Sequence, residues 1–117
     1  IEADPSAVSD FRHNVQALDP VEIIEGKAHT ALARLGGPVD LMILDPPRSG
    51  AGKKVVVEVA RLQPSRVVYV SCDPASLARD ARLLAEASYH VLVVQRVFLF
   101  AQTYHVESVG LFLNERG

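Results

Sequence analysis

Cysteine, tryptophan and long apolar runs are scarce or absent in this sequence. Cys72 is the only cysteine among the 117 residues, and there is no tryptophan. A single thiol excludes an internal disulfide and argues against a zinc cluster, and a free thiol suits the reducing cytoplasm, where we expect the protein to work. No apolar run reaches the ~20 residues of a membrane span, and no segment has the pattern of a signal peptide. We therefore expect no association with a membrane.

An excess of charge of one sign is also missing. The chain has 12 Lys and Arg against 14 Asp and Glu, which gives a net charge of -2 with its four histidines neutral. A self-sufficient nucleic-acid-binding module normally has a basic excess, so composition alone argues against one. The hydrophobic content of 49% excludes a disordered tail and indicates one globular unit over residues 1–117. Because the first residue is Ile1, we expect this unit to be part of a longer chain.

The sequence does contain a regular alternation of helical and strand patterns. Apolar spacing predicts helices over 5–18, 28–35, 50–62 and from 74 onward, and strands over 21–24, 39–44, 67–71, 89–94 and 109–113. Asp4 or Ser6 is expected to cap the first helix, and Asp73 the helix that begins at Pro74. This alternation favours an α/β fold, a parallel sheet with helices on both faces. Its last two strands are expected to pair antiparallel at one edge.

The run Asp45-Pro46-Pro47-Arg48-Ser49-Gly50 follows the predicted strand over 39–44. Ligands of parallel α/β sheets bind at the carboxyl ends of the strands, where this run is expected to lie. Because prolines fix their backbone angles, the turn would hold the Asp45 carboxylate and the Arg48 guanidinium in fixed positions. The alternative is a tight structural turn with a solvated arginine.

Two further residues are candidates for chemistry at the same edge. Cys72 comes after the strand over 67–71 and just before the helix that Asp73 and Pro74 begin. The free amides of a helix N-terminus stabilise a thiolate, so Cys72 is a candidate nucleophile; the alternative is a small buried hydrophobic residue. Glu107, at the start of the last strand, is a candidate general base, although an isolated carboxylate is more often a surface residue.

Taken together, these segments are more specific than any one of them. The run Asp45-Pro-Pro-Arg-Ser-Gly50, followed after sixteen residues by Val67-Val-Tyr-Val-Ser-Cys72-Asp-Pro-Ala-Ser76, resembles the signature of the RNA 5-methyluridine methyltransferases. The run Gln102-Thr-Tyr-His-Val-Glu107 is similar to the second signature of that family. The resemblance implies a Rossmann-like class I methyltransferase fold, S-adenosylmethionine as the cofactor, and a uridine of tRNA or ribosomal RNA as the substrate.

The resemblance also implies a role for each candidate residue. Cys72 would attack C6 of the uracil ring, and Glu107 would remove the proton from C5 after that carbon has taken the methyl group. Asp45 would position the uracil or the cofactor, Arg48 would hold the motif or the RNA backbone, and His105 would contact the substrate. Because the sulfonium of the cofactor supplies the leaving group, no metal is expected.

Three residues are expected to contact the cofactor by the same resemblance. Glu2 would end the second strand and hold the ribose hydroxyls, Lys27 would contribute through its backbone, and Asp45 would contribute its carboxylate. The first strand and its glycine-rich loop are expected upstream, so the chain looks like the C-terminal part of a catalytic domain. Two positions depart from the family pattern, because Phe98 stands where an aspartate is usual and Ala101 where a proline is usual.

Three other interpretations remain open at the level of sequence. Amino-methyltransferases have a related Asp-Pro-Pro turn followed by an aromatic residue, but Arg48 occupies that position here and Cys72 would have no role. A cysteine hydrolase would use Cys72 with His105 as its base. The third interpretation is a methyltransferase-like module that folds without catalysing a reaction.

Overall fold

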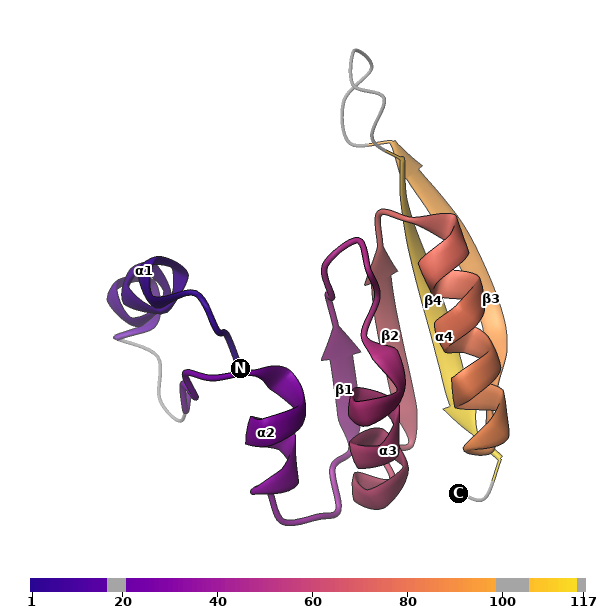
Figure 1. The fold of residues 1–117 in the computed structure, drawn as a ribbon, viewed down its shortest axis with the longest axis horizontal. Helices are drawn as coiled ribbons and strands as arrows, with labels where there is room; N and C mark the ends of the chain where they lie inside the picture. The colour runs from indigo at the N-terminus through magenta and orange to yellow at the C-terminus, as the bar shows by residue number, and fades with distance from the viewer. Residues whose placement is uncertain (17–20, 99–105, 116–117) are drawn as a thin grey trace. The chain divides into compact units, whose positions relative to one another are not determined.

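The computed structural model describes residues 1–16, 21–98 and 106–115, which form two compact units, Ile1–Leu35 (unit 1) and Gly36–Gly117 (unit 2). Unit 1 contains the helices α1 (Pro5–Val15) and α2 (Ala28–Ala33) (Figure 1). At the start of α1 the Asp4 carboxylate accepts a hydrogen bond of 3.0 Å from the amide of the second helical residue. This contact confirms Asp4 as the cap.

The strand predicted over residues 21–24 is wrong. In the described part of unit 1, sheet-type pairing is limited to one parallel bridge between Glu2 and Glu25. It is made by the Glu2 amide, which donates to the Ile24 carbonyl at 3.0 Å, and by the Gly26 amide, which donates to the Glu2 carbonyl at 2.9 Å. Pairing does not extend further because the chain turns into α1 soon after Glu2, and a strand needs a continuous partner for its backbone groups.

Unit 2 is built on a four-stranded sheet in the order β1-β2-β4-β3. Its strands are β1 (Leu41–Leu44), β2 (Arg66–Ser71), β3 (Tyr89–Phe98) and β4 (Val106–Asn114). β1 and β2 pair parallel, whereas β4 pairs antiparallel with both β2 and β3. The order confirms the α/β class and the antiparallel pairing of the last two strands, and it places β3 at the edge of the sheet.

Two helices connect the strands of unit 2. α3 (Gly52–Leu62) joins β1 to β2, and α4 (Pro74–Glu86) joins β2 to β3. Both helices lie on the same side of the sheet (Figure 1). The start of α4 is as predicted, with Asp73 at the N-cap and a proline in the first turn, because the missing amide of proline costs nothing there.

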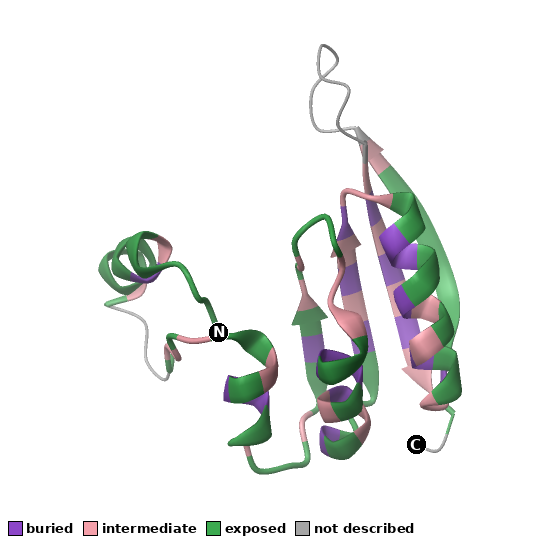
Figure 2. Ribbon diagram, viewed as in Figure 1, coloured by how far each residue is buried: buried purple, intermediate pink, exposed green. Residues whose placement is uncertain are grey.

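The face of the sheet that α3 and α4 cover holds the core of unit 2. Val67 and Tyr69 of β2 are 0% exposed and Phe112 of β4 is 1% exposed, and Figure 2 shows buried segments in the strands behind α3 and α4. On the other face, Leu41 and Ile43 of β1 are 49% and 64% exposed. The two helices of unit 2 therefore lie on one face of its sheet, although the apolar run of β1 predicted cover on both faces.

The last two strands are longer than predicted. The sequence indicated strands over 89–94 and 109–113 joined by residues 95–107, whereas β3 continues to Phe98 and β4 begins at Val106. The additional pairs include Arg96 with Ser108 and Val97 with Glu107. Polar side chains hid this extension, because an edge strand needs only its backbone groups to pair and its exposed side chains give no apolar alternation.

Candidate active site

Cys72 and Glu107 lie at the same end of the sheet, the edge formed by the carboxyl ends of β1 and β2. Ser71, the last residue of β2, pairs with Ser108 of β4. Because these two strands are antiparallel, the residue after Ser71 and the residue before Ser108 are the next neighbours beyond that pair. Both are half-buried, and the Cys72 thiol is free. The topology thus brings the two candidate residues together from distant parts of the sequence.

The turn Asp45–Gly50 lies at the same edge, because it follows β1, the parallel neighbour of β2. Within the turn, the Gly50 amide donates to the Pro47 carbonyl at 2.8 Å. Gly50 has a φ of 88°, a left-handed conformation that favours glycine. The side chains of Asp45 and Arg48 are exposed. The expected turn is therefore present, with both candidate side chains available at the surface.

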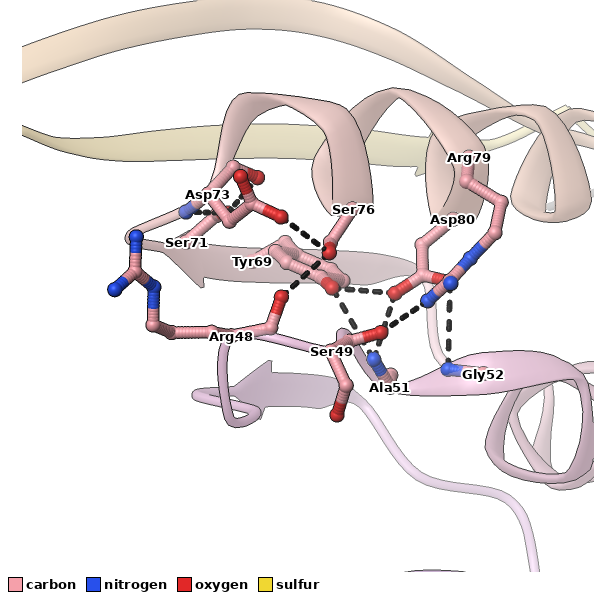
Figure 3. Close-up of polar contacts among 10 residues, drawn as sticks. All are labelled: Arg48, Ser49, Ala51, Gly52, Tyr69, Ser71, Asp73, Ser76, Arg79 and Asp80. Atoms are coloured by element: carbon pink, nitrogen blue, oxygen red, sulfur yellow. Dashed lines mark hydrogen bonds and ion pairs between the residues drawn. The ribbon is translucent and has the colours of Figure 1, made fainter.

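The structure adds a residue that the sequence analysis missed, Asp80 of α4, which is 0% exposed. Its Oδ2 accepts hydrogen bonds from the Tyr69 hydroxyl and from the Ala51 amide, the latter at 2.7 Å, and its Oδ1 accepts from the Gly52 amide at 3.3 Å (Figure 3). Ala51 is the N-cap of α3 and its side chain makes no cap hydrogen bond. Asp80 therefore caps α3 from a different helix, where a negative charge is favoured.

A sequence signal for Asp80 exists in the pattern of α4. Leu77 and Leu84, which are buried, define the apolar stripe of the helix. Asp80 falls between them at helical spacing, on the stripe where an apolar residue is expected. A charged residue in such a position indicates a buried side chain with hydrogen-bond partners.

Ser76, one turn before Asp80 on α4, connects the turn after β1 to the segment after β2 through its hydroxyl. The hydroxyl oxygen lies 2.5 Å from the Arg48 carbonyl oxygen and 2.7 Å from Oδ2 of Asp73, so its single proton is shared between two acceptors (Figure 3). The hydrogen bond from Ser76 holds the pKa of Asp73 below its usual value, and the charge of Arg48 adds to this effect. The residue after Cys72 is thus connected to the turn after β1.

Arg79 makes a third contact between α4 and the turn. Its Nη2 donates to the Ser49 carbonyl and lies 3.5 Å from Oδ1 of Asp80. Tyr69 lies beneath these groups, with the Ala51 amide donating to its hydroxyl oxygen at 3.3 Å. Burial, followed by the hydrogen bond to Asp80, raises the pKa of Tyr69 well above its usual value. The phenol therefore stays protonated and acts as a donor to the carboxylate.

The expected cofactor residues are divided between the two units. Glu2 and Lys27 belong to unit 1, whereas Asp45 belongs to unit 2. Glu2 is exposed, and its Oε1 accepts a hydrogen bond of 3.0 Å from the Asp4 amide. Lys27 is exposed at the N-cap of α2. A carboxylate has about four lone-pair positions, so Glu2 keeps acceptor capacity for hydroxyl donors.

Some predicted residues lie outside the part of the chain that the structure describes. His105 and Ala101 lie outside the described residues, and for Phe98 only the backbone, in β3, is described. Within residues 1–16, 21–98 and 106–115, no three His, Cys, Asp or Glu residues are placed to hold a metal ion. In the same ranges, no helix is long and apolar enough to cross a membrane.

Comparison with known proteins gives a consistent result. The family model described as tRNA (uracil-5-)-methyltransferase matches residues 37–116, which is nearly the whole of unit 2. An uncharacterized RNA methyltransferase of Streptomyces avermitilis is 45% identical over 112 residues, which cover 95% of this chain and 26% of the relative. The chain thus spans about a quarter of the length of that curated relative.

Solved structures give the same picture. The chain is similar to the Pyrococcus abyssi tRNA (uracil-54, C5)-methyltransferase in complex with S-adenosyl-L-homocysteine, with a TM-score of 0.77 and 28% identity over 95% of this chain and 27% of that chain. A precorrin-6y C5,15-methyltransferase from Geobacter metallireducens has a TM-score of 0.70 at 16% identity, covering 95% of this chain and 65% of that chain. At that identity the second likeness shows the fold alone, a Rossmann-like sheet of the class I methyltransferases.

Proposed function

Because the chain belongs to the tRNA (uracil-5-)-methyltransferase family, we propose that its protein transfers a methyl group from S-adenosylmethionine to C5 of a uridine in tRNA or ribosomal RNA. The observation that carries this proposal is the pairing of Ser71 with Ser108. It makes Cys72 and Glu107 neighbours at the edge where the turn Asp45–Gly50 also lies. A thiol beside a carboxylate is the pair of groups that uracil C5 methylation requires.

Cys72 is the nucleophile. C5 of uracil is a weak nucleophile by itself, so the thiolate adds to C6, and the ring becomes an enolate whose electron density is raised at C5. When bound, S-adenosylmethionine supplies an electrophilic methyl group on its sulfonium. Cys72 is half-buried directly after β2, and its thiol is free.

Glu107 is the general base that completes the reaction. After methylation C5 carries both the methyl group and its original proton, and the ring stays bonded to Cys72. The carboxylate takes that proton, the electron pair of the C5–H bond re-forms the C5–C6 double bond, and the bond from sulfur to C6 breaks. The thiolate is released, and a proton has passed from C5 to Glu107.

The residues of this chain fit the cofactor by the chemistry of their polar groups. Glu2 offers an exposed carboxylate with acceptor capacity for ribose hydroxyls. Asp45 offers a second exposed carboxylate, which suits a cationic or hydroxyl donor of the cofactor or an N–H of the uracil. Lys27 contributes through its backbone.

The same edge is suited to RNA. Arg48 is exposed, and its backbone carbonyl accepts a hydrogen bond from Ser76. Its guanidinium can therefore bind a phosphate while its backbone is held in place. His105 is assigned to the substrate on the resemblance of the second signature alone. Because Cys72 must stay reduced to react, we place the reaction in the cytoplasm.

The test uses the full-length protein and a uridine-containing tRNA or ribosomal RNA transcript. Cys72→Ala is expected to abolish both 5-methyluridine formation, measured by mass spectrometry of nucleosides, and the covalent complex with 5-fluorouridine RNA. A Cys72→Ala protein that still methylates C5 would overturn the mechanism. Methyl transfer to an exocyclic amine instead of C5 would favour the amino-methyltransferase.

A second variant tests the base. Glu107→Gln is expected to accumulate a methylated covalent complex with ordinary RNA, because the thiolate cannot leave until the C5 proton is removed. Glu86→Gln, which changes an exposed carboxylate at the far end of α4, is the matched control and is expected to turn over normally. Normal turnover by Glu107→Gln would mean that another group is the base.

A further inference from the structure

Four backbone groups of the segment 48–52 are bonded to side chains of α4. The Arg48 carbonyl accepts from Ser76, the Ser49 carbonyl accepts from Arg79, and the Ala51 and Gly52 amides donate to Asp80. The turn after β1 is thus fixed by side chains from one helix rather than by its own hydrogen bonds alone.

Gly50 makes this attachment closer than a side chain would permit. A Cβ atom on Gly50 would lie 2.6 Å from Oδ2 of Asp80, 2.5 Å from Nη2 of Arg79 and 3.2 Å from Cβ of Ser76. The backbone of the turn therefore lies directly against the polar face of α4. A shift of the turn away from the helix would break the hydrogen bonds of Arg48 and Ser49 on one side of Gly50 and those of Ala51 and Gly52 on the other.

Stability by itself does not account for Asp80. A buried polar network contributes little net stability compared with well-packed apolar residues in place of all its members, because the desolvation of the carboxylate offsets much of what its hydrogen bonds gain. Asp80 instead accepts hydrogen bonds from the two amides that directly follow the turn, at the start of α3, and from the Tyr69 hydroxyl, and its Oδ1 lies 3.5 Å from Nη2 of Arg79, which bonds the turn at Ser49. This arrangement is suited to fixing geometry.

The helix that holds the turn also begins directly after Cys72. Asp73 is the N-cap of α4, and Ser76 bonds both Asp73 and the Arg48 carbonyl. The segment that carries Cys72 and the turn that carries Asp45 are therefore attached to the same rigid element. Contacts with α4, and not only the pairing of β1 with β2, therefore fix the position of the turn relative to the segment that carries Cys72.

We propose that Ser76 and Asp80 are positioning residues for methyl transfer, which hold the Asp45–Gly50 turn at a fixed place relative to Cys72. The inference rests on the proposed function and adds two residues to it that act through the backbone groups they bond. Because a misplacement of about 1 Å can cost about 100-fold in rate, loss of either residue should lower the rate of the chemical steps more than it lowers binding.

The first experiment compares Ser76→Ala with Ser76→Thr in the full-length protein. Ser76→Ala removes the hydroxyl and is expected to lower kcat by about 10-fold to 100-fold, with the KM for RNA within about threefold of the unchanged protein. Ser76→Thr keeps a hydroxyl and is expected to recover most of that loss. Ser65→Ala, at an exposed serine outside the network, is the matched control and should have no effect.

A second measurement separates positioning from loosened structure. The rate of covalent complex formation with 5-fluorouridine RNA should fall along with kcat in Ser76→Ala. Alkylation of the Cys72 peptide by iodoacetamide should keep its rate, because the thiol environment is intact. A general loss of structure would instead speed alkylation and lower the melting temperature without any recovery in Ser76→Thr, and that result would overturn the proposal.

Asp80→Asn and Tyr69→Phe extend the test to the other half of the network. Asp80→Asn keeps the shape but replaces one acceptor oxygen with a donor, so its kcat should fall at least as far as that of Ser76→Ala. Tyr69→Phe removes a single hydroxyl and should give a smaller decrease. If Asp80→Asn does not fold, the Ser76 pair decides the outcome.

These experiments also test the positioning role separately from the proposed methyl transfer to uridine. If the unchanged protein forms no 5-methyluridine and no covalent complex, the proposed function is wrong and the positioning role falls with it. If the unchanged protein is active and the folded Ser76→Ala and Asp80→Asn proteins match its kcat, the function stands and the positioning role is wrong.

Discussion

Gly50 and Asp80 approach so closely that no side chain fits between them. A Cβ atom built on Gly50 would lie 2.6 Å from the Asp80 carboxylate oxygen, well inside van der Waals contact. The two residues come from the turn after β1 and from the middle of α4. Their contact joins the turn after β1 to the helix that follows Cys72, and we use it to predict how substitutions at either residue should behave.

Three glycines provide a graded test of that contact. Gly50→Ala combines a steric clash with an unfavourable φ of 88°, Gly52→Ala has only the unfavourable φ of 83°, and Gly36→Ala has neither. We expect a loss of about 1 kcal/mol for Gly52→Ala and about 2–4 kcal/mol for Gly50→Ala. Gly36→Ala should be neutral or slightly stabilising. Unfolding in urea measures the series, and equal effects at Gly50 and Gly52 would contradict the clash.

Removal of the Asp80 carboxylate should be strongly destabilising. Asp80→Leu leaves the Tyr69 hydroxyl and the Gly52 amide without their acceptor, and the Ala51 amide loses the shorter of its two hydrogen bonds. Each such orphaned donor costs about 1–3 kcal/mol, so the total loss is expected to be about 3 kcal/mol or more. Glu86→Leu, at the exposed end of the same helix, is the control. A small effect of Asp80→Leu in urea unfolding would mean that water replaces the carboxylate.

The raised pKa of Tyr69 predicts that the protein loses stability at alkaline pH. Burial and the hydrogen bond to Asp80 raise the pKa of Tyr69 above its usual value of 10.0. Above pH ~10 the unfolded chain releases the phenolic proton while the folded state keeps it, so the free energy of unfolding decreases as pH rises. The contribution is fully present at lower pH. Urea midpoints measured from about pH 9 to 11 should fall less steeply for Tyr69→Phe than for the unchanged protein, and parallel curves would exclude this cause.

The pKa of Asp73 should depend on the hydroxyl of Ser76. The hydrogen bond from the Ser76 hydroxyl lowers the pKa of Asp73 below 3.8. A carboxyl whose pKa is depressed in the folded state stabilises the fold above its unfolded pKa, and this stabilisation is lost as pH falls through the folded pKa. In Ser76→Ala the pKa of Asp73 should move up toward its usual value. NMR titration of the carboxyl carbon measures the change, and an unaltered pKa would remove Ser76 as its main cause.

Parts of this site could be inferred from sequence because they depend on local patterns. The proline-rich turn after an apolar strand predicted the position of Asp45 and Arg48, and the Asp73-Pro74 start of a helix predicted where Cys72 would lie. Both follow from backbone preferences of neighbouring residues. The strand over residues 21–24 was wrong for the opposite reason, since an apolar run becomes a strand only where a partner runs beside it.

Apart from the strand over residues 21–24, the sequence by itself determined the order of helices and strands, the turn Asp45–Gly50, and the candidate pair Cys72 and Glu107. Only the tertiary structure decided that Ser71 pairs with Ser108 and so makes that pair neighbours. It alone decided that Asp80 bonds the amides of Ala51 and Gly52. The physical reason is that local patterns depend on residues a few positions apart, whereas a register or a buried polar contact depends on which distant backbone groups find one another.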